Sequence, residues 1–207
     1  MSTSLVLSER PKRRPKVPEH LVYEELNGRP LYYAGYRDVL EGRKTPEEIR
    51  GSSDIQAIVV GAIFGFIHAN LDRRKYWITT NESGLHLKKG DNLSNDIAIF
   101  AKSDVPVLRG KYFNVPPKVV VEVDVKVELP ADEFPAREAD YVFEKSARLL
   151  AFGVERVIWI TTHTRKLFVA TPNDPWTVQN WDRDAPVLDD CVLNLARLLE
   201  EEGIVWE

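Results

Sequence analysis

Residues 119–127 combine an apolar run with three ionisable side chains in the order Val-Val-Val-Glu-Val-Asp-Val-Lys-Val. Side chains along a β-strand point alternately to opposite faces, so a strand over this range would place Glu122, Asp124 and Lys126 on one face. The valine-rich start favours a central, buried strand. A strand with one solvated face fits the same alternation, so the pattern alone leaves open whether this row is a site or a surface.

A further carboxylate stands at the entry of another predicted strand, because Asp96 directly precedes the apolar run Ile97–Ala101. Asp96, Glu122 and Asp124 could then meet around one divalent cation. Mg²⁺ and Mn²⁺ take oxygen ligands, commonly one or two carboxylates with water and a phosphate oxygen. Such a metal activates water and offsets charge on phosphorus, and a lysine, here Lys126, orients the water or stabilises that charge. The pattern therefore favours metal-dependent phosphodiester hydrolysis.

Hydrophobic periodicity predicts the elements that would position these side chains. Residues 53–70 and 136–152 have apolar positions at helical spacing, and Gly153 is placed to end the second helix. Asn27-Gly28 predicts a hairpin within residues 21–31. Shorter helices are predicted from residue 45 and over 192–202, and strands over 76–80, 84–88, 97–101, 119–127, 156–162 and 166–171. We expect an α/β (α+β) fold in which a mixed central sheet is flanked by helices.

From Val22 to about Thr171, the chain resembles the Uma2 family (DUF820), a branch of the PD-(D/E)XK nuclease superfamily with a restriction-endonuclease-like fold. Four segments carry this resemblance. Residues 23–28 are similar to the family's opening Glu-Leu-x-x-Gly hairpin, and residues 95–99 are similar to its Pro-Asp strand entry. Residues 120–123 are similar to its acidic core strand, and Lys145 with residues 152–159 is similar to its lysine-bearing helix, which runs into a Gly-Val turn and an aromatic strand. Asn95 departs from the family, which usually has proline there.

The resemblance implies a metal-dependent endonuclease that hydrolyses DNA with Mg²⁺ or Mn²⁺ as cofactor. It implies that Asp96 and Glu122 bind the metal, that Glu24 completes the acidic cluster and that Lys145 is the catalytic lysine. The strand pattern instead points to Lys126, with Asp124 as an assisting ligand. Both lysines stay candidates, and Lys145 is preferred.

Two other functions remain open from the sequence. One is a catalytically inactive binding or scaffold protein that keeps the nuclease fold, and the other is a hydrolase of smaller phosphodiesters or nucleotides. Many nucleases of the superfamily act as dimers, so a homodimer is one oligomeric state that the resemblance allows.

Composition limits the class of protein. The chain has 207 residues and a net charge of −4, which argues against a general polyanion binder. We expect one domain over 20–207, preceded by a proline-rich arm over 1–19 whose basic residues are Arg10, Lys12, Arg13, Arg14 and Lys16. The single cysteine, Cys191, excludes an internal disulfide. With no long apolar run and no signal-peptide pattern, we expect a cytoplasmic protein that does not enter membranes.

Overall fold

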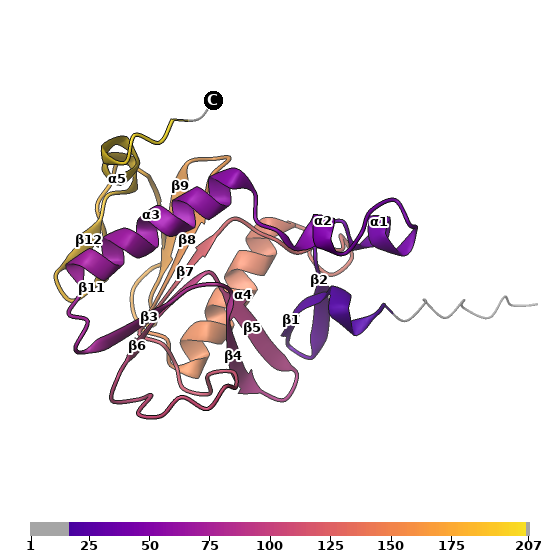
Figure 1. The fold of residues 1–207 in the computed structure, drawn as a ribbon, viewed down its shortest axis with the longest axis horizontal. Helices are drawn as coiled ribbons and strands as arrows, with labels where there is room; N and C mark the ends of the chain where they lie inside the picture. Colours follow the sequence, from indigo (N-terminus) through magenta and orange to yellow (C-terminus); the bar gives the residue numbers. More distant parts are fainter. Residues whose placement is uncertain (1–16, 206–207) are drawn as a thin grey trace, which may run out of the picture.

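The computed structural model describes residues 17–205. Its centre is a six-stranded sheet with helices on both sides, as Figure 1 shows. The strand order is β10-β9-β8-β7-β6-β3, and the strands are β3 (Tyr76–Thr79), β6 (Ile97–Ala101), β7 (Val119–Val123), β8 (Arg156–Thr161), β9 (Lys166–Ala170) and β10 (Thr177–Asn180). Neighbouring strands of this sheet within residues 17–205 are antiparallel, except for the parallel pair β7–β8. The sheet is therefore mixed, as predicted.

A second, four-stranded sheet lies beside the central one, with the order β2-β1-β5-β4. Its strands are β1 (Val22–Leu26), β2 (Arg29–Tyr32), β4 (Ser83–Lys88) and β5 (Asp91–Asn95). The turn between β1 and β2 is the predicted one, since Asn27 and Gly28 both have positive φ, 53° and 74°. At one of its crossings from the second sheet to the central one, the chain passes through a single residue, Asp96, between the end of β5 and the start of β6.

The remaining elements are short except for two helices. They are η1 (Glu19–Leu21), α1 (Tyr36–Leu40), α2 (Glu47–Arg50), α3 (Asp54–Asn70), α4 (Glu138–Phe152), α5 (Leu195–Glu201) and the hairpin of β11 (Ala185–Leu188) with β12 (Cys191–Leu193). The long helices match their predictions closely. Ser53 caps α3 by accepting a hydrogen bond from the Gln56 amide, and Gly153 ends α4 with a φ of 117°.

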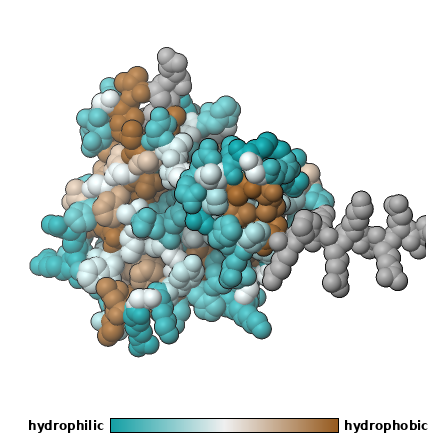
Figure 2. Space-filling view, turned by 45° about the vertical axis from the view of Figure 1, so that its right-hand side comes forward, coloured by the Kyte–Doolittle hydropathy of each residue, from teal (hydrophilic) through white to brown (hydrophobic). Residues whose placement is uncertain are grey.

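The core occupies both faces of the central sheet, which explains the apolar run in β7. Val119, Val121 and Val123 pack with α3 and α5 in one cluster, whereas Val120 packs with α4 and the second sheet in another. All five residues of β7 are buried, Glu122 included. In Figure 2, hydrophilic side chains cover much of the visible face, with smaller apolar patches between them. No helix within residues 17–205 has both the length and the apolar character needed to span a bilayer.

The strand predicted over 119–127 is too long, because β7 ends at Val123. Asp124 has a φ of 57°, in the left-handed region, so the extended conformation cannot continue through it. The following residues turn toward the β1–β2 hairpin, where the Ala34 amide donates to the Lys126 carbonyl oxygen over 2.8 Å. Alternation along one strand therefore does not place Glu122, Asp124 and Lys126 on a common face.

Two other predictions need correction. No element was predicted between the strands at 84–88 and 97–101, but residues 91–95 form strand β5, whose polar sequence Asp-Asn-Leu-Ser-Asn lacks the usual strand composition. The helix expected over 192–202 is strand β12 followed by α5, which begins at Leu195 after the Asn194 cap. The basic arm predicted over 1–19 lies, except for its last three residues, outside the described residues.

Candidate functional site

Four charged side chains of the predicted site are buried where the two sheets meet. Glu24 comes from β1, Asp96 from the β5–β6 junction, Glu122 from β7 and Lys145 from α4. Antiparallel pairing of β6 with β7 sets Ile97 opposite Val121, and this register continued by one residue brings Asp96 opposite Glu122. A further hydrogen bond, from the Val123 amide to Asp96 Oδ2 over 2.8 Å, holds the Asp96 carboxylate against the end of β7.

Lys145 is the centre of the deeper half of the site. Its Nζ lies 2.9 Å from Glu24 Oε2 and 3.1 Å from Glu122 Oε1, and donates to the Ser94 carbonyl oxygen over 2.8 Å. The Tyr141 hydroxyl, one helical turn earlier on α4, donates to Glu24 Oε1 over 2.6 Å. With a side chain only 1% exposed, Lys145 is fully enclosed by these partners.

The carboxyl group of Glu122 has a strongly raised pKa. Burial raises the pKa of Glu122 to about 8, and the nearby Asp96 and Glu24 carboxylates add to the rise while Lys145 opposes it. Burial acts to lower the pKa of Lys145, but the Glu122 and Glu24 carboxylates outweigh it and hold that pKa above its ordinary value. Burial thus favours the protonated form of Glu122, and the Lys145 ammonium group 3.1 Å away favours the carboxylate.

Lys126 and Asp96 form the outer half of the site. Lys126 Nζ lies 3.0 Å from Asp96 Oδ1 and 3.0 Å from Glu82 Oε1, in the loop before β4. Burial acts to lower the pKa of Lys126, but the Asp96 and Glu82 carboxylates raise it above its ordinary value. Asp96, Glu82 and Lys126 line a cavity of about 400 Å³ together with Arg50, Ser52, Ala57, Val60, Thr80 and Asn81. The outer half of the site is thus reachable from solvent.

Asp124 does not join either half. Its two carboxylate oxygens accept hydrogen bonds from the Thr162 amide, over 2.8 Å, and the Thr162 hydroxyl, over 2.7 Å. The Asp124 amide in turn donates to the Ile160 carbonyl oxygen. These contacts tie the end of β7 to the end of β8. Asp124 therefore has a structural role and does not join Asp96 and Glu122.

Replacing Asp124 with alanine is therefore expected to lower the free energy of unfolding by about 1–3 kcal/mol, because two hydrogen bonds to a carboxylate are lost. Urea denaturation of the wild type and of Asp124→Ala measures this change. The Mn²⁺ concentration needed for half-maximal stabilisation of the folded chain should stay the same in the variant. A weaker Mn²⁺ response with unchanged stability would instead make Asp124 a ligand.

Carboxylates are the type of ligand that a hard divalent cation binds, and the number of carboxylates in the site is at the lower limit of what such a cation needs. Asp96 and Glu122 supply the one or two carboxylates that Mg²⁺ commonly takes. Glu122 Oε1 is buried without a hydrogen-bond partner among the described residues, which leaves it available as a ligand despite the Lys145 ammonium 3.1 Å away. Glu24 is already held by Lys145 and Tyr141. Over residues 17–205, no group of three or more His, Cys, Asp or Glu side chains is arranged to hold a metal ion.

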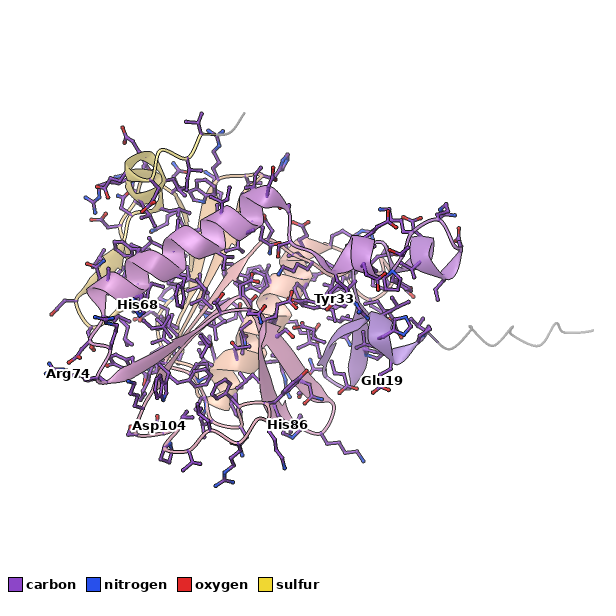
Figure 3. The ribbon with its side chains drawn as sticks, viewed as in Figure 1. Glu19, Tyr33, His68, Arg74, His86 and Asp104 are labelled. Carbon is purple, nitrogen blue, oxygen red and sulfur yellow. The ribbon has the colours of Figure 1, made fainter. Side chains whose placement is uncertain are left out.

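Two charged residues that line this cavity, Glu82 and Arg50, were not anticipated from the sequence. Glu82 lies in the loop before β4 and Arg50 at the end of a four-residue helix, so neither has a periodic pattern that would single it out. Tyr33 follows β2 and pairs with Val127 through an isolated bridge. Figure 3 labels Tyr33, which lies between the α2 end of the molecule and the two sheets.

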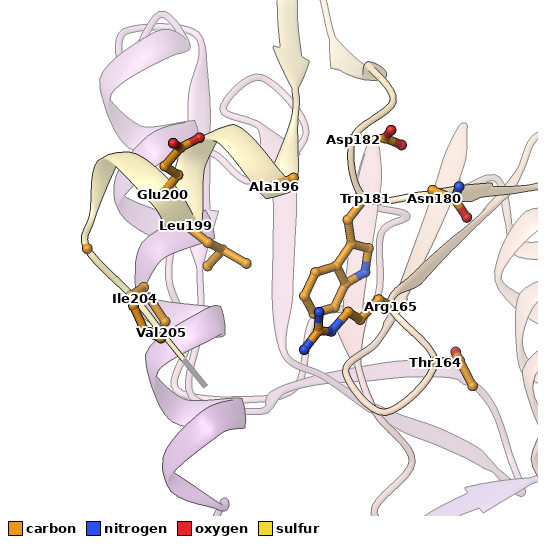
Figure 4. Close-up of a pocket in the computed structure, with 11 residues that line it drawn as sticks. Thr164, Arg165, Asn180, Trp181, Asp182, Ala196, Leu199, Glu200, Ile204 and Val205 are labelled. Atoms are coloured by element: carbon orange, nitrogen blue, oxygen red, sulfur yellow. The ribbon is translucent and has the colours of Figure 1, made fainter. Parts of the chain in front are cut away.

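A second cavity, of about 560 Å³, lies near α5 and contains none of the predicted site residues. Figure 4 shows its mixed lining, with Trp181, Leu199 and Ile204 beside the charged Arg165 and Glu200. It has no cluster of carboxylates and offers no chemistry comparable to the site around Asp96.

Comparison with known proteins relates the chain to one kind of fold. No family model matches the sequence, and no curated protein matches it. Among solved structures, the crystal structure of a "putative nuclease belonging to DUF820" from Anabaena variabilis ATCC 29413 superposes with a TM-score of 0.63. The match covers 86% of this chain and 89% of that chain, at 14% sequence identity. The chain therefore has a mixed α+β fold that is similar to the fold of this DUF820 protein.

Proposed function

We propose that the protein is a metal-dependent endonuclease that hydrolyses DNA phosphodiester bonds with Mg²⁺ or Mn²⁺. The observation that carries the proposal is the placement of Asp96 and Glu122 opposite each other across β6 and β7, beside a solvent-accessible cavity and with two lysines within ion-pair distance. The resemblance of the sequence segments around these residues to the Uma2 family, and the fold shared with a DUF820 protein, support the same conclusion.

In this proposal, Asp96 and Glu122 would hold the metal ion through carboxylate oxygens. When bound, the ion would activate a water molecule and offset charge on phosphorus. A carboxyl group must be deprotonated to act as a ligand, so metal binding at Glu122 would have to overcome the burial that raises its pKa. The Val123 amide keeps the Asp96 carboxylate in place by donating to its Oδ2 atom.

The two lysines take different roles in this proposal because they differ in exposure. Lys126 lines the cavity, so its ammonium group can reach a substrate phosphate or the attacking water. Lys145 is enclosed, and it orients Glu122 and keeps a positive charge beside it when the Glu122 proton leaves. Lys126 is thus our candidate for contact with substrate, and Lys145 for positioning, although the family resemblance favours Lys145 as the catalytic lysine.

Replacing Asp96 with asparagine tests the proposal. We expect at least a hundredfold loss of Mn²⁺-dependent cleavage of plasmid DNA, because the amide keeps the shape of the side chain but not the charge that binds the metal. Asp104→Asn is the matched control, since Asp104 is exposed, does not line the cavity and lies away from Tyr33 in Figure 3. Circular dichroism verifies that both variants are folded. Full activity in Asp96→Asn would contradict the assignment.

A catalytically inactive binding or scaffold protein is the second candidate. It is favoured by the ion pairs in the site, because the Lys126 ammonium already lies on Asp96 Oδ1, where a metal ion would have to bind. Thermal unfolding with increasing Mn²⁺ separates the two candidates. A cation that binds only the folded chain adds about 2.7 kcal/mol at one hundred times its dissociation constant, whereas a protein without a site shows no increase in melting temperature.

A further inference from the structure

The cavity beside Asp96 is also lined by two residues that the proposed metal chemistry does not use. They are Arg50, the last residue of α2, and Ser52, in the link to α3. Both residues are exposed. They bring a cation and a hydroxyl group to the rim of the same cavity of about 400 Å³ that gives access to Asp96.

Arg50 differs from the other cation of the cavity in its partners. Lys126 is matched by two carboxylates, Asp96 and Glu82. Arg50 forms no ion pair within the described part of the chain, and its recorded hydrogen bond runs from Nη2 to the His20 carbonyl oxygen. A guanidinium group has five N–H donors, so most of the donors of Arg50 remain available to a ligand.

The two cations and the carboxylate of the proposed site border one cavity. Arg50, Lys126 and Asp96 all line the same space of about 400 Å³. The nearby Tyr33 is within the electrostatic influence of both cations, since Arg50 and Lys126 each act to lower its pKa while burial and Glu82 raise it. An anion bound by Arg50 would therefore enter the cavity that Asp96 and Lys126 also line.

We propose that Arg50, assisted by the Ser52 hydroxyl, binds a phosphate of the DNA backbone next to the bond that is cleaved. The inference rests on the proposed nuclease function and adds the substrate contact to it. A guanidinium group binds phosphate through two parallel hydrogen bonds, which fixes the orientation of the strand as well as attracting it. The contact is to the backbone, so it carries no sequence preference.

Binding of a fluorescently labelled DNA duplex in EDTA, measured by anisotropy, tests the inference without cleavage. Arg50→Gln is expected to weaken binding about tenfold and to reduce the slope of log affinity against log salt by about one. Arg50→Lys should keep the salt slope but not the full affinity, because it keeps the charge without the paired hydrogen bonds. Arg197→Gln is the matched control, since Arg197 is exposed on α5, at the other end of the molecule from α2 in Figure 1.

Unchanged duplex affinity in a folded Arg50→Gln variant would overturn the inference, as would absence of duplex binding by the wild type. An equal loss of affinity for deoxythymidine monophosphate would assign Arg50 to small nucleotides instead of the DNA backbone. Steady-state cleavage with Mn²⁺ separates this inference from the proposed function. A raised KM with little change in kcat in Arg50→Gln supports a contact to substrate, whereas a wild type that binds DNA but never cleaves it removes the nuclease function and leaves the contact standing.

Discussion

Replacing Lys145 with methionine is expected to lower the free energy of unfolding by about 3–5 kcal/mol, the cost of leaving a buried carboxylate without its partner. The Lys145 side chain is 1% exposed, and its ammonium group lies between Glu24 and Glu122. Methionine is similar in length but carries no charge, so Glu24 would keep only the Tyr141 hydroxyl and the Ser94 amide. Urea denaturation at pH 7 measures the change.

Lys118→Met is the matched control for this variant. Lys118 Nζ lies 2.7 Å from Glu155 Oε1, a shorter separation than either Lys145 pair, but the two side chains are 33% and 55% exposed. A surface pair of this kind contributes about 0–1 kcal/mol, so the same substitution should have little effect there. Similar losses in Lys118→Met and Lys145→Met would contradict the conclusion that burial makes the Lys145 cluster important for stability.

The stability of the wild type is expected to fall between pH 5 and pH 8 because of Glu122. In the folded chain the Glu122 pKa is about 8, above its ordinary value of 4.5, so the folded state binds this proton more tightly than the unfolded state. The stabilisation is therefore fully present below about pH 4.5 and is lost as the pH rises toward 8. One such group contributes a slope of about 1.4 kcal/mol per pH unit within that window. Urea denaturation in EDTA across this range measures the slope.

Glu122→Gln isolates the contribution of this group, because glutamine imitates the protonated carboxyl at every pH. The variant should match the wild type near pH 5 and become relatively more stable as the pH rises. Glu155→Gln removes a carboxylate from an exposed position, and it should not reproduce the pH-dependent gain of Glu122→Gln. Parallel stability curves for the wild type and Glu122→Gln would show that Glu122 is already ionised at low pH in the folded chain.

Much of the framework of the site follows from local sequence patterns. The helical spacing of apolar residues and the Ser53 cap predict α3, and Gly153 predicts the end of α4. These features depend on neighbours within a few residues, so one sequence suffices to find them. The buried run at 119–123 likewise predicts a central strand with Glu122 inside it.

The arrangement of the site depends on contacts that no local pattern records. Asp124 leaves the extended conformation at a point where its carboxylate accepts a hydrogen bond from the Thr162 amide, 38 residues later, and Lys126, two residues on, lies 3.0 Å from Asp96 Oδ1. Strand β5 forms because it pairs with β4 and β1, although its composition is that of a loop. Lys145 is placed next to Glu122 by the packing of α4, which only the resemblance to a known family suggested.

The hydrogen bond between Tyr141 and Glu24 joins residues that are 117 positions apart in the sequence. Closing a loop of that length costs conformational entropy, which the contacts of the buried cluster must offset. In the unfolded chain, Glu24, Glu122 and Lys145 are hydrated, and Glu122 has its ordinary proton affinity. The raised pKa of Glu122 therefore exists only where β7 and α4 are assembled around it, and titration of Glu122 can serve as a probe of that assembly.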